Sequence, residues 1–390
     1  MVKIDADWLK RPGIKRIVEC LGAENIRFVG GVVRDTLIGR KVHDIDAATV
    51  HTPHEATKLL EACDIKVIPT GIDHGTVTAI ADSAKVEVTT LRQDMETDGR
   101  RAVVAFTDNW KADAARRDFT FNALYLSADG TLNDPFDGIK DLKAGRVRFI
   151  GNAETRIEED ALRILRFFRF HAWYGKGQPD ETGLAACKQK VVLLKALSAE
   201  RVRDELLKLI AAPKPMEALT ALERTGATAV LPLGTLNSVR LQHYIDNEDR
   251  FEFKPDAILR LSAWLALEPE AVPIFAKRFR LSKKQREQML AVVTALHATA
   301  PATPEALHAF IYQYGNDAAK CALFVQEVCG EALVQTLKDW PVPEFPLKGG
   351  DLIAAGVDAG PAVSKLMKQL EQDWVASDFS LSRDELLKRV

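Results

Sequence analysis

Hydrophobic and polar positions follow two different rhythms along the 390 residues of the chain. In the first quarter, short apolar runs typical of strands alternate with segments of helical spacing. The predicted strands cover residues 26–29, 43–47, 76–80 and 85–90, and the predicted helices cover residues 14–21, 32–38 and 53–61. From residue 156 onward, apolar side chains recur at helical spacing with proline breaks. The pattern predicts an α/β unit followed by an all-α remainder.

A pair of aspartates lies in the second predicted strand. Asp44 and Asp46 are two residues apart, and residues at that spacing project from the same face of a strand. Both carboxylates then point at one spot, which suits a hard divalent cation such as Mg²⁺. Glu87 lies opposite the core-facing Val86 and Val88 in a later strand. It is a candidate metal ligand or proton-accepting helper, with a solvated strand glutamate as the alternative.

A glycine pair precedes these aspartates. Gly30 and Gly31 lack side chains, so the backbone can approach a phosphate closely and present its N–H groups. Arg34 adds a guanidinium fork that suits phosphate oxygens. A lone glycine pair is more often a turn, and a lone Asp-X-Asp sequence is often solvated. The two features therefore carry weight in combination.

The combined spacing, G-G-x-x-R-D-x-L-x-G followed by D-x-D, resembles the head motif of class II tRNA nucleotidyltransferases. This family includes CCA-adding enzymes and related bacterial poly(A) polymerases, within the polymerase β-like superfamily. The resemblance implies an α/β (α+β) head with an antiparallel-type sheet, followed by an all-α neck, body and tail. The implied segments are a head at 1–145, a neck for base selection at 146–215, a body at 216–345 and a tail for the tRNA elbow at 346–390.

A polar segment covers residues 93–108, QDMETDGRRAVVAFTD, and is predicted to be a mobile loop. It resembles a flexible loop of the family that takes part in the switch from adding C to adding A. The positions that match are Asp98, Gly99, Arg100 and Arg101.

Residues 116–124, RRDFTFNAL, resemble the second motif of the family. A side-chain acceptor such as Asp118 can bind a ribose 2′-hydroxyl, which distinguishes ribonucleotides from deoxyribonucleotides. Arg117 is expected to bind the nucleotide phosphates, and Asn122 to orient the ribose or the loop. The alternative is a helix cap that is purely structural.

The segment 156–172, RIEEDALRILRFFRFHA, is predicted to be one amphipathic helix. Asp160 and Arg163 are neighbours on one face of such a helix. The carboxylate can accept a hydrogen bond from the amino group that cytosine and adenine share, and the guanidinium can donate one to the ring nitrogen. Guanine and uracil present the opposite polarity, so the pair resembles the protein template of the family. Arg166 and Arg169 are expected to bind triphosphate or primer, and an ordinary surface ion pair is the alternative.

The chain carries a formal net charge of −2, so whole-chain charge does not indicate a nucleic-acid partner. Residues 140–215, however, contain sixteen Lys and Arg against ten Asp and Glu. This segment is a candidate RNA-facing surface, although a solvated helical face is possible. No apolar run is long enough to predict a membrane span.

Five cysteines are present, without a CxxC pair. Cys20, Cys63, Cys187, Cys321 and Cys329 lie in apolar contexts. They are expected to be buried, reduced thiols of a cytoplasmic protein, rather than disulfides or zinc ligands.

The resemblance implies that the chain adds CCA to the 3′ end of tRNA, with CTP and ATP as substrates and two Mg²⁺ ions held by Asp44 and Asp46. No protein partner and no membrane are implied. A poly(A) polymerase of the same fold and an enzyme that adds only CC or only A remain alternatives. A non-catalytic RNA-binding protein is disfavoured, because binding alone does not require metal-ligating carboxylates.

Overall fold

The computed structural model describes residues 2–94 and 104–390. Contacts divide the chain into two compact units. The first comprises Met1–Leu197 and Glu217–Val230, and the second comprises Ser198–Met216 and Leu231–Val390. The finer division into head, neck, body and tail stays a prediction. The predicted loop positions 98–101 lie outside the described residues.

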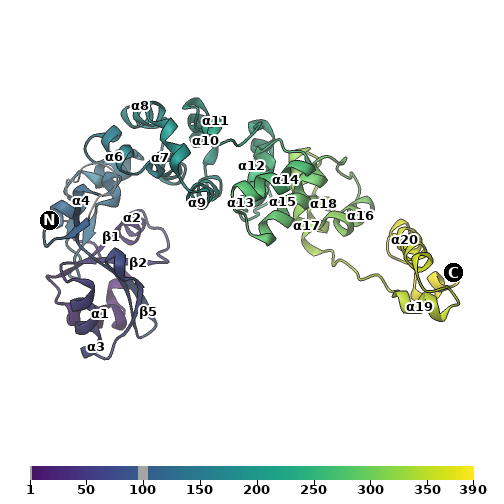
Figure 1. Cartoon of the computed structure of the whole chain (residues 1–390), viewed down its shortest axis with the longest axis horizontal. Coiled ribbons are helices and arrows are strands. Elements are labelled where there is room, and N and C mark those ends of the chain that lie inside the picture. The colour runs from purple at the N-terminus through teal and green to yellow at the C-terminus, as the bar shows by residue number, and fades with distance from the viewer. Residues whose placement is uncertain (1, 95–103) are drawn as a thin grey trace. The chain divides into compact units, whose positions relative to one another are not determined.

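The first unit contains a mixed β-sheet (Figure 1). Among the described residues, seven strands form this sheet in the order β3-β4-β5-β2-β1-β8-β9, and β6 and β7 form a separate hairpin. The strands are β1 (Ile26–Val29), β2 (Ile45–Thr49), β3 (Lys66–Gly71), β4 (Thr76–Ala81), β5 (Ala84–Thr90), β6 (Arg92–Asp94), β7 (Val104–Phe106), β8 (Tyr125–Leu126) and β9 (Leu132–Asn133).

The register of the sheet brings two acidic residues side by side. β2 and β5 are parallel, and Asp46 is the partner of Glu87 between them. The expected antiparallel-type sheet is therefore wrong for this pair, although the other pairs of the sheet are antiparallel. Parallel neighbours need a crossover connection, and α3, β3 and β4 supply it here. The predicted alternation in β5 is confirmed, because Val86 and Val88 are buried.

Short helices flank the sheet, and α1 and α3 lie side by side against β4 (Figure 1). Gly22 follows α1 with a positive φ of 83°, which ends the helix as expected. The helices of the first unit are η1 (Asp7–Lys10), α1 (Pro12–Leu21), α2 (Gly31–Leu37), α3 (Pro53–Ala62), η2 (Ile72–His74), α4 (Trp110–Ala115), η3 (Thr120–Asn122), α5 (Gly138–Ala144), α6 (Ala153–Glu159), α7 (Leu162–Tyr174), α8 (Glu181–Gln189), η4 (Val191–Ala196) and α11 (Ala227–Val230).

An aromatic cluster joins α7 to the segment after α4. The ring of Phe119 lies 4.8 Å from that of Phe149 and 5.4 Å from that of Phe170, measured between centroids. Phe149 also stacks on Phe167 at 5.6 Å. Aromatic pairs at these separations add to the hydrophobic stabilisation, so the cluster fixes α7 relative to the sheet.

The cysteine prediction is wrong for one pair. Cys20 in α1 and Cys63, the residue after α3, form a disulfide. The two residues are 43 positions apart in the sequence, and they meet because α1 and α3 pack on each other. Cys187 and Cys321 are buried free thiols as expected, and Cys329 is a half-buried one.

The second unit is helical, and Arg260 and Glu248 form an ion pair in its core with fully buried side chains. Ser198 caps α9 through the backbone N–H of Arg201, as the sequence predicts. Its helices are α9 (Ala199–Ile210), α12 (Ser238–Arg250), α13 (Ala257–Trp264), η5 (Pro269–Ala271), α14 (Val272–Arg278), α15 (Lys283–Leu296), α16 (Pro304–Tyr314), α17 (Asn316–Val325), α18 (Glu331–Asp339), α19 (Gly349–Ala354), α20 (Pro361–Ala376) and α21 (Arg383–Leu387). The helix α10 (Pro215–Arg224) begins in this unit, and its residues from Glu217 onward belong to the first unit.

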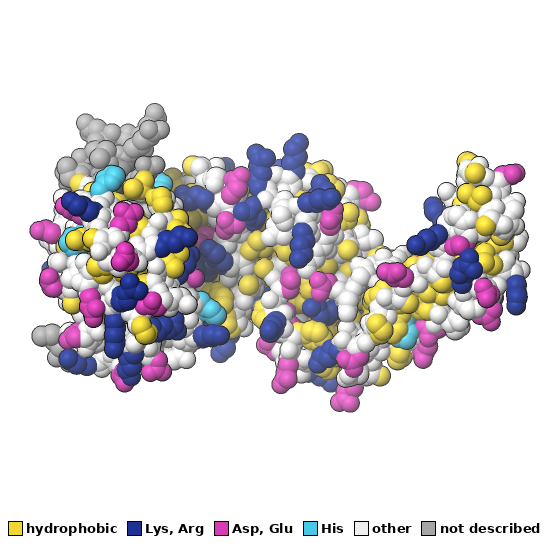
Figure 2. Space-filling view, turned by 90° about the horizontal axis from the view of Figure 1, so that it is seen from below, with side chains coloured by type: hydrophobic (Ala, Val, Ile, Leu, Met, Phe, Trp, Pro, Cys, Tyr) yellow, Lys and Arg dark blue, Asp and Glu magenta, His cyan; other side chains and the backbone are white. Residues whose placement is uncertain are grey.

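The last three helices share a small core, against which Tyr312 of α16 also packs. Leu352, Leu370, Trp374 and Leu386 are buried together there. On the face shown in Figure 2, Lys and Arg side chains are interspersed with Asp and Glu over most of the surface. No helix in the described part of the chain is long and apolar enough to cross a membrane.

Candidate active site

A pocket of about 490 Å³ lies in the first unit, between the sheet and α7. Seven arginines and four aspartates line it, so its formal charge is positive. Every residue predicted to bind nucleotide lines this pocket, together with one of the predicted metal ligands. The lining residues are Gly30, Gly31, Arg34, Asp46, Ala48, Thr89, Arg92, Asp113, Arg116, Arg117, Asp118, Asn122, Asp160, Arg163, Arg166, Arg169 and Phe170.

The glycine pair forms the turn between β1 and α2. Gly30 has a φ of 73°, a left-handed conformation that favours glycine. A Cβ atom at Gly30 would lie 3.9 Å from Nη1 of Arg117, and one at Gly31 would lie 3.7 Å from Nη2 of Arg34. Two guanidinium groups therefore border a turn that has no side chains. This arrangement suits a polyanion, because backbone N–H groups and both arginines can reach the same phosphates.

The guanidinium group of Arg34 is held in place from several sides. Its Nη1 donates to Oδ1 of Asn122 at 2.6 Å, and its Nε donates to Asp35 at 3.1 Å. The guanidinium carbon lies 4.3 Å from the centre of the Tyr174 ring in α7. Only 7% of Arg34 is exposed. The side chain is thus preorganised at the pocket wall, which lowers the entropy cost of binding an anion.

Asp118 is buried at the base of the pocket and already accepts several hydrogen bonds. Its Oδ1 accepts from the backbone N–H of Phe119 and from Nδ2 of Asn122, both at 2.9 Å. Its Oδ2 accepts from Nε of Arg166 at 2.7 Å. Burial alone would raise the pKa of this carboxyl, but Arg166 and these hydrogen bonds hold the pKa below its usual value. Asp118 is therefore an ionised acceptor, which a ribose hydroxyl can reach by replacing a donor of Arg166.

The predicted metal ligands are arranged differently from expectation. β2 begins at Ile45, so Asp44 lies just before the strand and is exposed, whereas Asp46 lies within it. Glu87 pairs with Lys85 at 3.5 Å and does not line the pocket. Among the described residues, no three His, Cys, Asp or Glu side chains lie close enough together to hold a metal ion.

The ionised form of Asp46 is nevertheless destabilised by its surroundings. Burial, followed by the negative charges of Glu87 and Asp44, raises its pKa to about 6, against the opposing effect of Arg117 and Arg34. A carboxylate in this environment is stabilised by a nearby cation. The donor set of Asp44 and Asp46 therefore fits a hard divalent ion that completes its coordination with water and substrate oxygens.

The prediction of one continuous helix over residues 156–172 is wrong. α6 ends at Glu159, and α7 begins at Leu162. Asp160 between them is extended, with φ −153° and ψ 103°, and its side chain accepts from the backbone N–H of Leu162. Aspartate competes with helical hydrogen bonds in this way. The break turns both Asp160 and Arg163 toward the pocket.

Backbone carbonyls hold the guanidinium group of Arg163. Its Nη1 donates to the carbonyl of Arg156 at 2.7 Å, and its Nη2 donates to the carbonyl of Arg116 at 3.1 Å. Glu159 adds an ion pair to the same guanidinium. The side chain is thus fixed by α6 and by the segment after α4, so it can present a rigid donor to a base.

The chain is similar in sequence to proteins of known function. The model of the poly A polymerase head domain matches residues 26–148, and that of the probable RNA and SrmB-binding site of polymerase A matches residues 178–234. The mitochondrial CCA tRNA nucleotidyltransferase 1 of Mus musculus is 33% identical, over 97% of this chain and 89% of that protein. The chain belongs to the CCA tRNA nucleotidyltransferase family.

Other members of the CCA tRNA nucleotidyltransferase family are also similar to this chain, in sequence and in structure. The CCA-adding enzyme of Lactobacillus gasseri is 33% identical, over 93% of this chain and 91% of that protein. The crystal structure of the Bacillus stearothermophilus CCA-adding enzyme in complex with CTP matches with a TM-score of 0.73 and 26% identity, covering 97% of this chain and 98% of that chain. The predicted family, enzyme class and head fold are confirmed. Nucleotidyltransferases of this family are generally metal-dependent.

Several residues that line the pocket of this nucleotidyltransferase were not predicted from the sequence. Asp113 in α4 and Arg92 in β6 line it, and neither was predicted. Asp113 is four residues before Arg117, the spacing of neighbours on a helix, so an ion pair could have been proposed from the sequence. Arg92 had no comparable signal. It reaches the pocket only because β6 begins close to the end of β5.

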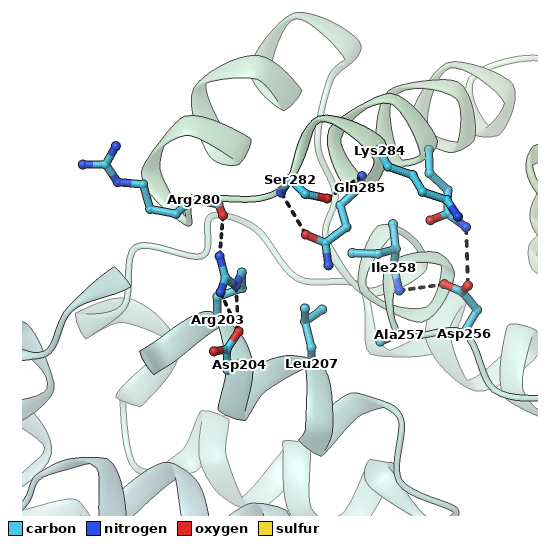
Figure 3. A pocket seen from close by; sticks show the side chains of 11 residues that line it. Arg203, Asp204, Leu207, Asp256, Ala257, Ile258, Arg280, Ser282, Lys284 and Gln285 are labelled. Carbon is cyan, nitrogen blue, oxygen red and sulfur yellow. Dashed lines mark hydrogen bonds and ion pairs between the residues drawn. The ribbon is translucent and has the colours of Figure 1, made fainter. Parts of the chain in front are cut away.

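A second pocket, of about 580 Å³, lies among α9, α13 and α15 of the helical unit (Figure 3). Several of its polar groups are engaged within the fold. Arg203 pairs with Asp204 and donates to the carbonyl of Arg280, and Asp256 caps α13. None of the residues predicted to bind nucleotide or metal lines this pocket, so size alone does not identify the site of this nucleotidyltransferase.

Proposed function

We propose that the chain adds CCA to the 3′ end of tRNA, using CTP and ATP without a nucleic-acid template. The terminal 3′-oxygen of the tRNA forms a bond to the α-phosphorus of the nucleotide, and the bond from that phosphorus to the bridging oxygen breaks. Pyrophosphate leaves, and the hydroxyl proton passes to a base or to water. One observation carries the proposal: Asp160 and Arg163 line the same pocket as the glycine turn and Asp46.

Asp44 and Asp46 are the residues that would hold the metal, which we propose to be two Mg²⁺ ions. The raised pKa of Asp46 supports this assignment. When bound, such ions activate the attacking hydroxyl and neutralise charge on the leaving group. Glu87, the partner of Asp46 across β2 and β5, adds negative charge beside them and is proposed as an electrostatic helper.

The arginines of the pocket bind the triphosphate in this proposal. Arg34 and Arg117 border the Gly30–Gly31 turn, so they are proposed to contact the phosphates together with backbone N–H groups. Arg166 and Arg169 add positive charge from α7. Asp118 accepts a hydrogen bond from the ribose 2′-hydroxyl, and Asn122 orients Asp118 through the hydrogen bond between them.

Asp160 and Arg163 select the base. Cytosine and adenine both present an amino donor beside a ring-nitrogen acceptor, which complement a carboxylate and a guanidinium. Guanine and uracil would place a carbonyl against the carboxylate and a ring N–H against the guanidinium. Polar groups left unpaired in this way are costly. The fixed guanidinium of Arg163 supports this role, because a rigid donor cannot rotate to accommodate the wrong base.

The remainder of the chain is proposed to bind the tRNA. The basic segment 140–215 is the candidate surface for the acceptor end, and the helices after residue 346 are the candidate site for the elbow, recognised by shape. The loop positions 98–101 are proposed to act in the switch from C to A. A cytoplasmic location accords with this role.

Two alternatives share the same pocket. A poly(A) polymerase is suggested by the descriptions of the matching head and RNA-binding models. An enzyme that adds only part of CCA would use the same metal and phosphate groups. Curated relatives named for CCA addition over nearly the whole chain favour full CCA addition.

Extension of three tRNA transcripts tests the proposal. The transcripts end before CCA, after C and after CC, and each is incubated with one labelled nucleotide and Mg²⁺. We expect two C residues and then one A, followed by arrest. Repeated A addition to unrelated RNA ends would instead establish a poly(A) polymerase, and A addition restricted to the CC-ended transcript would establish an A-adding enzyme.

A further inference from the structure

Asp113 is a buried carboxylate at the wall of the nucleotide pocket. Its side chain is 4% exposed, in the middle of the short helix α4. Oδ2 accepts three hydrogen bonds: from Nη2 of Arg117 at 3.0 Å, from Nε of Arg117 at 3.2 Å and from the hydroxyl of Tyr125 at 2.6 Å. One oxygen therefore holds one edge of the guanidinium group, through two of its nitrogens.

The other oxygen of Asp113 reaches a different element. Oδ1 accepts from the backbone N–H of Arg92 at 3.1 Å, and Arg92 is the first residue of β6. The carboxylate thus links α4, the β6 backbone and Arg117. Because Nε and Nη2 of Arg117 are used in this way, its Nη1 is the nitrogen that faces the turn at Gly30.

Electrostatics keeps this arrangement charged. Burial alone would raise the pKa of Asp113, but Arg117, Tyr125 and the Arg92 backbone hold it below the usual value. Burial likewise raises the pKa of Tyr125, which therefore stays a neutral donor. Asp113 is an ionised acceptor, and Arg117 and Tyr125 both donate to it.

We propose that Asp113 is the positioning residue for the triphosphate-binding arginine of this enzyme. It fixes the guanidinium of Arg117 so that Nη1 faces the Gly30 turn, and it ties that orientation to the start of β6. Tyr125 supports Asp113 from the sheet, since its hydroxyl also contacts Nε of Arg117 at 3.2 Å. The inference rests on the proposed function, because it assigns Arg117 to the nucleotide phosphates.

The substitution Asp113→Asn tests this role with little change of shape. An asparagine offers one oxygen and one NH₂ group, so it cannot accept from both the Arg92 backbone and Arg117. We expect kcat/KM for CTP to fall about 10- to 100-fold, as misplacement of a binding group by about 1 Å can cost that much. Tyr125→Phe removes one donor and keeps the ring, so a smaller loss is expected.

Asp141→Asn is the matched control. Asp141 in α5 is also buried, with 2% of its side chain exposed, and it accepts from Nε of Arg148 at 2.8 Å and from Thr120 at 2.7 Å. It does not line the pocket. Both substitutions remove a buried charge partner, so a comparable loss of stability is expected. Only Asp113→Asn is expected to weaken CTP binding.

A double-mutant cycle with Arg117→Ala separates positioning from general damage. CTP affinity and transfer rate are measured for each single variant and for the double variant. If Asp113 acts through Arg117, the Asp113→Asn change has less than about a twofold effect once Arg117 is absent. An equal loss in both backgrounds, or an equal loss from Asp141→Asn, would overturn the inference.

The same measurements distinguish failure of the inference from failure of the proposed function. If the unchanged chain binds CTP but does not extend tRNA, the proposed function is wrong, and the binding cycle still decides the role of Asp113. If the unchanged chain binds no CTP, both are overturned. If it extends tRNA and Asp113→Asn retains full CTP affinity, the inference alone is wrong.

Discussion

The two units each contain an arginine paired with a buried carboxylate, but one pair is enclosed by the fold and the other borders a pocket. In the helical unit, Arg260 and Glu248 are fully buried. Nε and Nη2 of Arg260 donate to Glu248, and Nη1 donates to the carbonyls of Ile210 and Ala212. All three nitrogens are engaged within the fold, at the end of α9.

In the first unit, Arg117 makes a similar ion pair with a different outcome. Asp113 and Tyr125 bind Nε and Nη2, while Nη1 faces Gly30 at the pocket wall. The side chain of Arg117 is 24% exposed. The same ion-pair chemistry is enclosed in one unit, where it serves stability, and borders a pocket in the other, where we propose that it serves ligand binding. The deciding feature is whether one edge of the guanidinium borders a pocket.

The largest expected effect concerns Asp44 and Asp46, the proposed metal ligands of the pocket. The enclosed ion pair of the helical unit has no such role. We predict that Asp44→Ala and Asp46→Asn each lower the transfer rate by about 10³-fold or more, because bound metal supplies several kcal/mol of charge stabilisation. Extension of a CC-ended tRNA with ATP measures the rate. Circular dichroism should show unchanged folding, and full residual activity would refute the metal assignment.

The second prediction contrasts the two arginines directly. Arg260→Leu should lower the free energy of unfolding by about 3–5 kcal/mol, since it leaves Glu248 buried and unpaired. Arg117→Ala should cost less stability, because Asp113 keeps its hydrogen bonds from Tyr125 and the backbone. It should weaken CTP binding by about 10- to 100-fold, the value of one charge-assisted contact. Urea unfolding and equilibrium CTP binding measure the two effects. If both variants lost equal stability and bound CTP with equal affinity, the distinction between the enclosed arginine and the pocket arginine would be wrong.

The third prediction concerns nucleotide choice. Arg163→Ala removes a donor that guanine and uracil cannot accept, so the ratio of kcat/KM for CTP over UTP should fall at least about tenfold. Arg148→Ala is the control, because Arg148 pairs with Asp141 outside the pocket. Unchanged rejection of UTP and GTP by the Arg163 variant would contradict base selection by this side chain.

The fourth prediction concerns stability without metal. The pKa of Asp46 is raised from 3.8 to about 6 in the folded chain, so its ionisation costs stability above pH 6, and the cost disappears below about pH 4. Asp46→Asn should therefore be more stable than the unchanged chain at pH 7.5 in EDTA, by up to about 3 kcal/mol. The difference should vanish at pH 4. A variant less stable at pH 7.5 would argue against the strained carboxylate.

Motif spacing predicted those parts of the site whose partners are close in sequence. β1 and the Gly30–Gly31 turn were predicted because hydrophobic spacing and glycine chemistry are local signals. The residues predicted to bind nucleotide all line the pocket. The interruption of the helix at Asp160 was not predicted, because the apolar residues keep helical spacing on both sides of it.

Contacts between distant segments could not be predicted. The Cys20–Cys63 disulfide depends on the packing of α1 against α3. The role of Asp113 depends on Tyr125 and Arg92, which α4 meets only after the sheet has formed. Such groups look like ordinary helix or strand residues in the sequence, because their partners are set by topology rather than by spacing.

The most direct test of the account asks whether one pocket binds both substrates. Labelled CTP is bound to the unchanged protein without tRNA, and each of the other nucleoside triphosphates is added in turn. The account predicts that ATP displaces CTP competitively, with an inhibition constant equal to its own dissociation constant, and that GTP and UTP displace it much more weakly. Simultaneous binding of ATP and CTP, or equal displacement by all four nucleotides, would contradict a single pocket in which Asp160 and Arg163 select the base.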